Sequence, residues 1–284
     1  MLDKIIDTHV HCWSFARAKY SWLKEDNVRL YRDFLPEEYD KERIAAGITD
    51  AILVQAANSF EDTDYMLDVA ARNDWVAGVV GWVPLLDPTQ AAVALQETYA
   101  SHPFFKGVRH LIHDEPDPKW LLQEPVIESL RLLADADIPF DVVGVLPQHL
   151  EVAIQLGEKV PHLKMVLNHL NQPPINSGEK FGTWGELMKA AAQNPNFFIK
   201  ISGLGNTSQK EDKWTADEIK PYVAFALEHF GTDRAFLGGN WPVALLAGSF
   251  QHTWQAYAKV IEALVGTAEQ ENIYYRNAEQ FYKI

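Results

Sequence analysis

The stretch KIIDTHVHCW, residues 4–13, decides between the two common architectures built from alternating strands and helices. The pattern predicts an apolar strand over 4–8, followed directly by a polar segment that contains two histidines. An open, dinucleotide-binding sheet would place a G-x-G-x-x-G turn here, and the stretch contains no glycine. The stretch therefore favours a closed barrel, in which polar residues at the strand ends form the site.

The rest of the chain supports a barrel because short apolar runs alternate with longer segments of helical spacing. Seven further strands are predicted at 51–55, 76–82, 105–111, 139–143, 164–168, 197–202 and 235–239. Helices are predicted at 36–46, 62–73, 88–101, 124–136, 147–158, 183–194, 215–230 and 249–265, and a further one at 268–282. We therefore expect an α/β protein with one domain over residues 1–284, a (β/α)₈ TIM barrel with an extra C-terminal helix.

Composition narrows the class of partner. The formal net charge is −14 and no basic run occurs, which argues against a nucleic-acid partner. No stretch approaches the roughly 20 apolar residues of a membrane span, so we expect no membrane partner. The single cysteine, Cys12, excludes an intramolecular disulfide, and the N-terminus does not resemble a signal peptide. These features predict a cytoplasmic protein that acts on a small molecule, and they leave a homo-oligomer possible.

Histidines and an arginine stand at several of the predicted strand ends. His9 and His11 are two residues apart on an extended segment, so their imidazoles point to the same side. His169 ends the sixth strand, and Arg109 with His110 ends the fourth. Imidazoles bind metals or move protons near neutral pH, and an arginine fork suits a carboxylate, phosphate or carbonyl group.

Each of these signals also has a structural interpretation. The H-x-H spacing is equally typical of two hydrogen-bonded histidines near a barrel mouth. Arg109 can instead form a salt bridge with a neighbouring acid of the Asp114-Glu115 pair. Lys200, inside the apolar seventh strand, is either a pocket residue or one whose stem extends to water.

Aromatic residues are the candidates for the pocket wall. Trp13 and Trp241 flank the polar strand ends, and Trp82 ends the third strand, although core packing is the commoner role for any single tryptophan. The long segment 14–35, rich in aromatic and basic residues, is expected to form a lid or part of the wall. Asp141, on the fifth strand, is expected to be structural.

Five fragments together resemble one branch of the amidohydrolase superfamily. They are DTHVHCW (7–13), FFKGVRHLIHDEPDPKWL (104–121), VLNHLNQPP (166–174), IKISGL (199–204) and FLGGNWPV (236–243). This branch is the amidohydrolase-related group that includes sugar lactonases and 2-pyrone-4,6-dicarboxylate lactonase. The resemblance implies a (β/α)₈ barrel that opens a lactone, a cyclic ester, to a hydroxy acid.

The resemblance also assigns roles to individual residues. It places His9, His11, His169 and Asn240 in the reaction centre, and it places Arg109 and His110 against the substrate. We expect Lys200 and the tryptophans at 13, 82 and 241 to complete the substrate site. Some members of the branch bind one divalent metal, so a zinc-type ion on the three histidines is one expectation and metal-independent chemistry is the other.

Two amides stand where the family usually has carboxylates. The fragment GGNWP has Asn240 in place of the usual aspartate, and Asn168 replaces a second one. A neutral amide can orient a water molecule but cannot deprotonate it, and losing general base catalysis costs about 10²–10⁴ in rate. The alternatives are a different base (His169, or His11 through a water), a protein that only binds lactones or sugar acids, an introduced substitution, and a metal-dependent decarboxylase.

Overall fold

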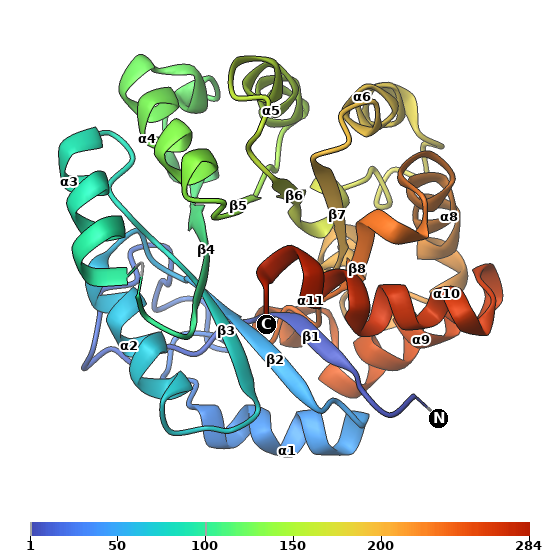
Figure 1. Ribbon diagram of the computed structural model, residues 1–284. Helices are drawn as coiled ribbons and strands as arrows, with labels where there is room; N and C mark the ends of the chain where they lie inside the picture. Colours follow the sequence, from blue (N-terminus) through green and yellow to red (C-terminus); the bar gives the residue numbers. More distant parts are fainter. Residues whose placement is uncertain (1, 100) are drawn as a thin grey trace.

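The computed structural model describes residues 2–99 and 101–284, which form a ring of strands surrounded by helices (Figure 1). Eight parallel strands are hydrogen-bonded in the order in which they occur in the chain. A parallel bridge between Val10 and Trp241 joins the first strand to the segment after the eighth. Hydrogen bonds of 2.7 Å from the His11 and Asn240 amides reinforce this closure. The fold is therefore the predicted (β/α)₈ barrel.

The eight strands are short and almost completely buried. They are β1 (Ile6–Val10), β2 (Asp50–Val54), β3 (Val76–Gly81), β4 (Phe105–His110), β5 (Phe140–Val142), β6 (Met165–Leu167), β7 (Phe197–Ile201) and β8 (Ala235–Leu237). Every predicted strand overlaps one of them. Apolar runs of this kind are typical of parallel strands, whose two faces are both covered.

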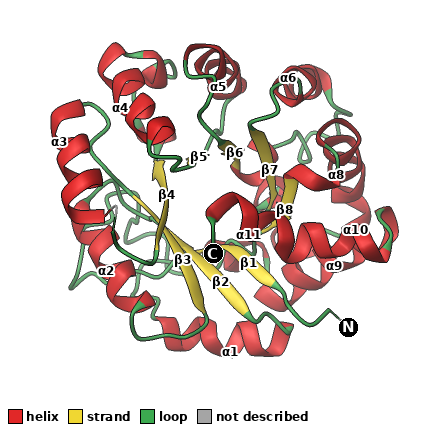
Figure 2. Cartoon of the chain, in the orientation of Figure 1, coloured by secondary structure: helices red, strands yellow, loops and turns green. Residues whose placement is uncertain are grey.

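Most helices lie outside the strands, as Figure 2 shows by secondary structure, and α11, the last of them, is the exception. The helices are α1 (Pro36–Ala46), α2 (Phe60–Ala70), α3 (Pro88–Val93), α4 (Glu124–Asp135), α5 (Pro147–Lys159), α6 (Gly182–Ala192), α7 (Leu204–Ser208), α8 (Ala216–Phe230), α9 (Phe250–Leu264), α10 (Thr267–Glu271) and α11 (Asn277–Tyr282). A π-helical turn, Ala94–Tyr99, continues α3, and residue 100 of the helix predicted at 88–101 lies outside the described residues. Within the described ranges, no helix is both long and apolar enough to cross a membrane.

Local sequence explains where several helices begin. The side chains of Ser59, Asp87 and Ser249 accept hydrogen bonds from backbone amides in the first turns of α2, α3 and α9. Such N-caps each stabilise a helix by about 1 kcal/mol. Proline at the start of α1 and α5 removes one backbone N–H that would have no partner within the helix.

The predicted C-terminal helix is divided into α10, a π-helical turn over Asn272–Arg276, and α11. Helix α11 lies at the centre of the ring in Figure 1. Its Phe281 and Tyr282 pack against inward-facing side chains of the strands, including Ile6 and Phe236. Lys283, which follows α11, donates to the carbonyl of Asp137 just before β5. Helix α11 therefore closes the amino-terminal end of the barrel, and the opposite end is left for a site.

Candidate active site

A cavity of about 510 Å³ opens at the carboxyl-terminal end of the barrel. The residues at its base are His11, Arg109, His169 and Asn240, which follow or end β1, β4, β6 and β8. Its wall is formed by Trp22, Ala56, Leu111, His113, Val143, Val145, Gln172, Pro173, Pro174, Asn176, Gly203, Asn206, Thr207, Gln209 and Val243. The structure thus brings His11, His169 and Asn240, from the first, sixth and eighth strand ends, around one cavity.

His9 on β1 and His11 just after it face the interior because the strand is irregular at this point. Asp7 pairs with Ala51 while Val10 pairs with Leu53, so β1 has one more residue than β2 over this interval. Such a bulge changes the direction in which the following side chains point. The rings of His9 and His11 consequently meet edge to face, with centroids 4.9 Å apart.

His9 and His11 occupy different depths. His11 lines the cavity, and its Nδ1 lies 2.7 Å from the carbonyl oxygen of Val54. Because a carbonyl only accepts, Nδ1 carries the proton and Nε2 keeps its lone pair. His9 is fully buried and does not line the cavity, and its ring centroid lies 4.6 Å from that of His169. His9 therefore supports the two cavity histidines from below.

Arg109 is a buried cation that has neutral partners. Its Nε donates to Gln55 Oε1 at 3.2 Å, and Nη2 donates to the Gln55 carbonyl. Its Nη1 lies 3.3 Å from His9 Nε2 and 3.5 Å from Asn168 Oδ1. Burial lowers the pKa of Arg109 to about 10, so the side chain is still charged at neutral pH. The suggested salt bridge with Asp114 or Glu115 does not form.

Asn240 is fixed mainly through its backbone. Its amide donates to the His9 carbonyl at 2.7 Å, and its own carbonyl accepts from Ala244 at 2.8 Å. Its φ of 57° is left-handed, a conformation that asparagine tolerates better than most residues. The side-chain Nδ2 lies 3.4 Å from Asn206 Oδ1, and the residue lines the cavity. The amide is thus placed where a water molecule can be held.

The site imidazoles are neutral at physiological pH. Burial, reinforced by nearby cationic groups, lowers the pKa of His9 and His169 well below the usual 6.5. Burial is the main cause that lowers the pKa of His11 to about 3, and the positive charge of Arg109 is the second. Each ring therefore keeps a lone pair on one nitrogen at neutral pH, and that of His9 accepts from Arg109.

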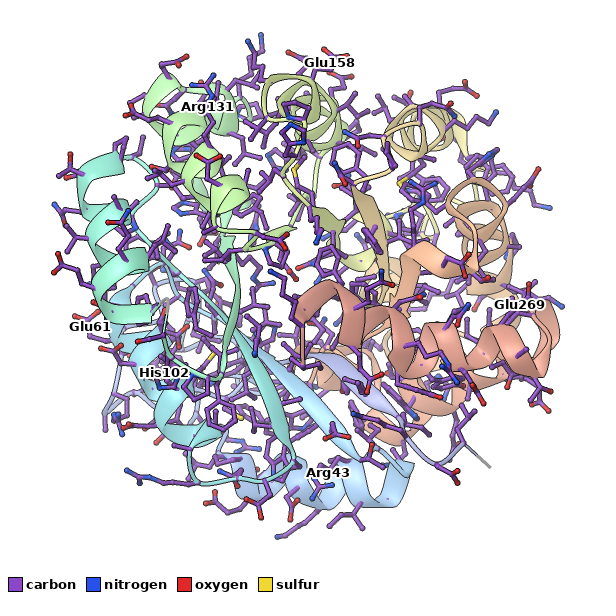
Figure 3. The ribbon with its side chains drawn as sticks, in the orientation of Figure 1. Arg43, Glu61, His102, Arg131, Glu158 and Glu269 are labelled. Atoms are coloured by element: carbon purple, nitrogen blue, oxygen red, sulfur yellow. The ribbon has the colours of Figure 1, made fainter. Side chains whose placement is uncertain are left out.

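The cavity contrasts with the charge of the whole chain. No aspartate or glutamate is found among the described residues that line it, although the sequence carries 39 of them. Carboxylates such as Glu61, Glu158 and Glu269 lie on the outer helices, as Figure 3 shows. Among the described residues that line the cavity, Arg109 is therefore the one lysine, arginine, aspartate or glutamate.

His110 and Trp82 lie behind the cavity wall rather than in it. Trp82 Nε1 donates to His110 Nδ1 at 3.0 Å, so the other ring nitrogen, Nε2, carries the proton. That nitrogen lies 2.7 Å from Glu115 Oε1, and the His110 ring stacks on Trp120 with centroids 4.0 Å apart. With its nitrogens occupied in this way, His110 holds the loop after β4 in place.

Trp13 and Trp241 are also packing residues. Both rings lie against Phe34, with centroid distances of 5.1 and 5.5 Å. Each is almost completely buried, and neither lines the cavity. Trp22 lines it instead and comes from segment 14–35, whose expected contribution to the wall is thus confirmed at this residue.

Lys200 does not reach the cavity. Its Nζ lies 2.8 Å from Asp141 Oδ2, 2.9 Å from the Thr8 carbonyl and 3.0 Å from the Tyr282 hydroxyl. The side chain is fully buried inside the barrel, below the histidines. This position contradicts the expected substrate contact of Lys200 and agrees with the structural role expected for Asp141.

Sequence reasoning missed most of the polar wall. The amides of Gln172, Asn176, Asn206 and Gln209 lie several residues beyond the strand ends, on loops or, for Asn206, in the short helix α7, where no spacing rule identifies them. His113, which also lines the cavity, was visible as a third polar residue shortly after β4. Because His113 lies beyond the end of the strand, the sequence gave no reason to place it in the cavity.

The expected three-histidine metal centre does not fit this arrangement. Across residues 2–99 and 101–284, no group of three or more histidine, cysteine or acidic side chains has the geometry to hold a metal ion. His9 Nε2, the nitrogen available to a metal, faces the Arg109 guanidinium at 3.3 Å. A divalent cation there would meet a buried positive charge, so we assign no step to a metal.

Fold and cavity together define a (β/α)₈ barrel with a histidine cluster at the carboxyl ends of its strands. The chain belongs to the amidohydrolase family, whose sequence profile matches residues 6–284. It is 32% identical to an L-fucono-1,5-lactonase of Burkholderia ambifaria, covering 98% of this chain and 95% of that one. A second L-fucono-1,5-lactonase, from Burkholderia multivorans, is 26% identical over 98% and 96% of the two chains. A crystal structure of a Burkholderia multivorans amidohydrolase with bound zinc matches with a TM-score of 0.91 at 25% identity, covering 99% of each chain.

Proposed function

We propose that this protein hydrolyses a sugar lactone to the corresponding hydroxy acid. Relatives that match along almost the whole chain are named as lactonases of sugar acids. The observation that carries the proposal is the cavity base, where neutral imidazoles, a buried guanidinium and an amide surround one space. Such a site can supply a proton acceptor, a stabiliser of negative charge and a holder of water.

The wall favours a polyhydroxylated lactone over one that carries several acid groups. Amides donate and accept hydrogen bonds at once, which suits the hydroxyl groups of a sugar. Four further amide side chains, Gln172, Asn176, Asn206 and Gln209, line the same cavity as the Asn240 amide. A lactone bearing two carboxylates would need more than one cation, and Arg109 is the one lysine or arginine in the described lining.

His169 acts as the general base in this proposal, because Asn240 has no usable proton affinity near neutral pH. A water held by Asn240 attacks the lactone carbonyl carbon, and one of its protons passes to His169 Nε2. The carbonyl oxygen becomes an oxyanion in the tetrahedral intermediate. Collapse of the intermediate breaks the ring C–O bond, and the proton on His169 passes to the leaving oxygen. The products are a hydroxyl group and a carboxylic acid, which then ionises.

Arg109 stabilises the oxyanion. Its guanidinium is buried and lacks a carboxylate partner, so its charge is free to act on negative charge that develops in the cavity. Its contacts with Gln55 and Asn168 hold the group in place before the reaction begins. Preorganised donors of this kind contribute about 10²–10³ in rate.

The proposal is tested with purified protein and a panel of aldonolactones near neutral pH, with acid release followed by an indicator. We expect turnover above background, lost in His169→Asn and retained in His162→Asn, an exposed histidine outside the cavity. If turnover appears only after Asn240→Asp, the hydrolase proposal fails for the natural chain, and binding of lactones or sugar acids without turnover is the alternative to measure. Release of CO₂ from an aromatic acid, with no acid formed from lactones, would identify a decarboxylase and overturn the proposal.

A further inference from the structure

We propose that Ser202 is a positioning residue for His169. Its hydroxyl holds the imidazole so that Nδ1 carries the proton and the Nε2 lone pair faces the cavity. The catalytic value of this contact rests on the proposed function, but the contact itself can be tested without turnover. Ser202 directly follows β7, is fully buried, and does not line the cavity.

The hydrogen bonds of Ser202 determine which nitrogen of His169 is protonated. Ser202 Oγ lies 2.8 Å from His169 Nδ1, 3.3 Å from the His169 backbone nitrogen and 3.5 Å from the Lys200 carbonyl oxygen. A hydroxyl can donate once and accept twice. All three contacts are used only when the hydroxyl donates to the carbonyl and accepts from both nitrogens of His169. Nδ1 is then the donor, and Nε2 keeps its lone pair for the base role.

The backbone around His169 has a conformation that is not intrinsically favoured. The φ angles of His169, Leu170, Asn171 and Gln172 are 57°, 50°, 51° and 53°, four consecutive left-handed residues without a glycine. Residues other than glycine rarely adopt this backbone conformation, so it is disfavoured at each of the four positions. The turn therefore depends on contacts made with other parts of the chain.

Two contacts support the turn, one from each side. Trp184 Nε1 on α6 donates to the Leu170 carbonyl at 2.7 Å, which anchors the far side of the turn. Ser202 anchors the near side through the backbone nitrogen and the ring of His169. Because Ser202 is the contact that reaches the imidazole, it sets the direction in which the ring points.

Gly203 also contributes to the position of the His169 imidazole. A Cβ atom at this position would lie 2.6 Å from His169 Nδ1, closer than real Cβ contacts come. Its φ of 63° is also a conformation that glycine adopts without strain. The backbone of residue 203 therefore lies directly against the imidazole, and the Ser202-Gly203 pair encloses the Nδ1 side of the ring.

The first experiment measures the tautomer. Long-range ¹H–¹⁵N correlation on protein labelled with ¹⁵N-histidine reports which ring nitrogen is protonated, and the His169→Asn spectrum assigns the signal. We expect the Nδ1–H form in the natural chain and a shift toward the Nε2–H form in Ser202→Ala. The matched control is Ser129→Ala, which removes another buried serine hydroxyl, bonded to the Leu85 carbonyl at 2.8 Å, and should leave the His169 signal unchanged. An unchanged His169 signal in Ser202→Ala would overturn the proposal.

The second experiment measures lactone turnover in the same variants. We expect Ser202→Ala to lower kcat by about 10- to 100-fold with little change in KM, because the lost bond is to a group that becomes charged during the reaction. Ser202→Cys, which keeps a weak hydrogen-bonding group of similar size, should recover part of the loss. Equal kcat in Ser202→Ala and Ser129→Ala would refute the positioning role. Absence of turnover in the natural chain would refute the proposed function and leave the tautomer result standing.

Discussion

Two buried polar layers lie one above the other inside this barrel, and they differ in how their charges are balanced. In the lower layer, Lys200 donates to Asp141 at 2.8 Å, and the Tyr282 hydroxyl donates to the other carboxylate oxygen at 2.7 Å. In the upper layer, Arg109 is bonded to neutral groups and the histidines are uncharged. The lower layer is closed by α11, whereas the upper layer opens into the cavity.

The way a buried charge is balanced distinguishes polar groups that stabilise the fold from polar groups that can act on a substrate. A charge that already has an opposite charge and all its hydrogen bonds has no capacity left for a ligand. A charge surrounded by neutral dipoles retains a field, and a substrate that develops negative charge can use it. Lys200 and Arg109 are both buried, so burial does not distinguish their roles. Their partners do, because Lys200 is paired with a carboxylate and Arg109 contacts neutral groups.

Asn168 connects the two layers and explains why an amide fits at this position. Its Nδ2 donates to Asp141 Oδ2 at 2.9 Å, and its Oδ1 lies 3.5 Å from Arg109 Nη1. The residue must donate on one side and accept on the other, which a carboxylate cannot do when ionised. The amide at 168 thus follows from the partners that surround it in this chain.

The largest effect expected is on stability, from Lys200→Met. The substitution leaves the Asp141 carboxylate buried without its cation, which costs about 3–5 kcal/mol in the free energy of unfolding. Urea denaturation followed by circular dichroism measures the loss, with the exposed Lys24→Met as control. Unchanged stability would mean that the lower layer is not a compensated ion pair, and the contrast between the layers would fail.

Arg109→Met tests the upper layer. Removing the preorganised guanidinium should lower kcat for the lactone by about 10²–10³, equivalent to about 2.7–4 kcal/mol of activation free energy. The rate loss should exceed the effect on folding, because the contacts of Arg109 are with neutral groups. Some loss of stability is expected as well, since the buried carboxylates Asp62 and Asp141 interact electrostatically with Arg109. Kinetics and urea denaturation of the same preparation separate the two quantities. A variant that keeps its kcat would show that the oxyanion is stabilised elsewhere.

A smaller effect on both quantities is expected from Asn168→Leu, which removes the connection between the layers. Asp141 Oδ2 keeps its bond to Lys200, so the cost in unfolding free energy should be limited to about 1–3 kcal/mol. Arg109 loses one of its holders, so kcat should fall by less than in Arg109→Met. Loss of stability without any change in kcat would indicate that the layers are energetically independent.

The sequence predicted the barrel well because apolar runs and helical spacing are local properties. The convergence of His9 and His11 was also predictable from alternation along a strand. The bulge that turns both of them inward was not, because it depends on pairing with β2. The left-handed turn at His169 was equally hidden, since none of its four residues is a glycine.

The misassigned residues show what a single sequence lacks. Lys200 was assigned to the substrate because its partners, Asp141 and Tyr282, lie 59 and 82 residues away in the chain. His110 stands at a strand end like Arg109, yet Trp82 and Glu115 occupy its two nitrogens. In both residues the chemical type suggested a site, and the partners supplied by distant segments made the role structural.

The smallest effect expected is a change in kcat/KM close to zero between pH 8 and pH 6.5. Burial lowers the pKa of His169 well below 6.5, and the electrostatic effects of Arg109, His11, Lys200 and His113 act in the same direction. An imidazole is an active base when it is neutral, so the acidic fall in kcat/KM should begin only below pH 6.5. Asn240→Asp places a carboxylate in the cavity, and this negative charge raises the pKa of the imidazoles, so the fall should move to higher pH. Rates corrected for spontaneous lactone hydrolysis measure both profiles. A natural chain whose rate already falls between pH 8 and 7 would show that the upper layer contains a compensating negative charge, which would remove the contrast with the layer below.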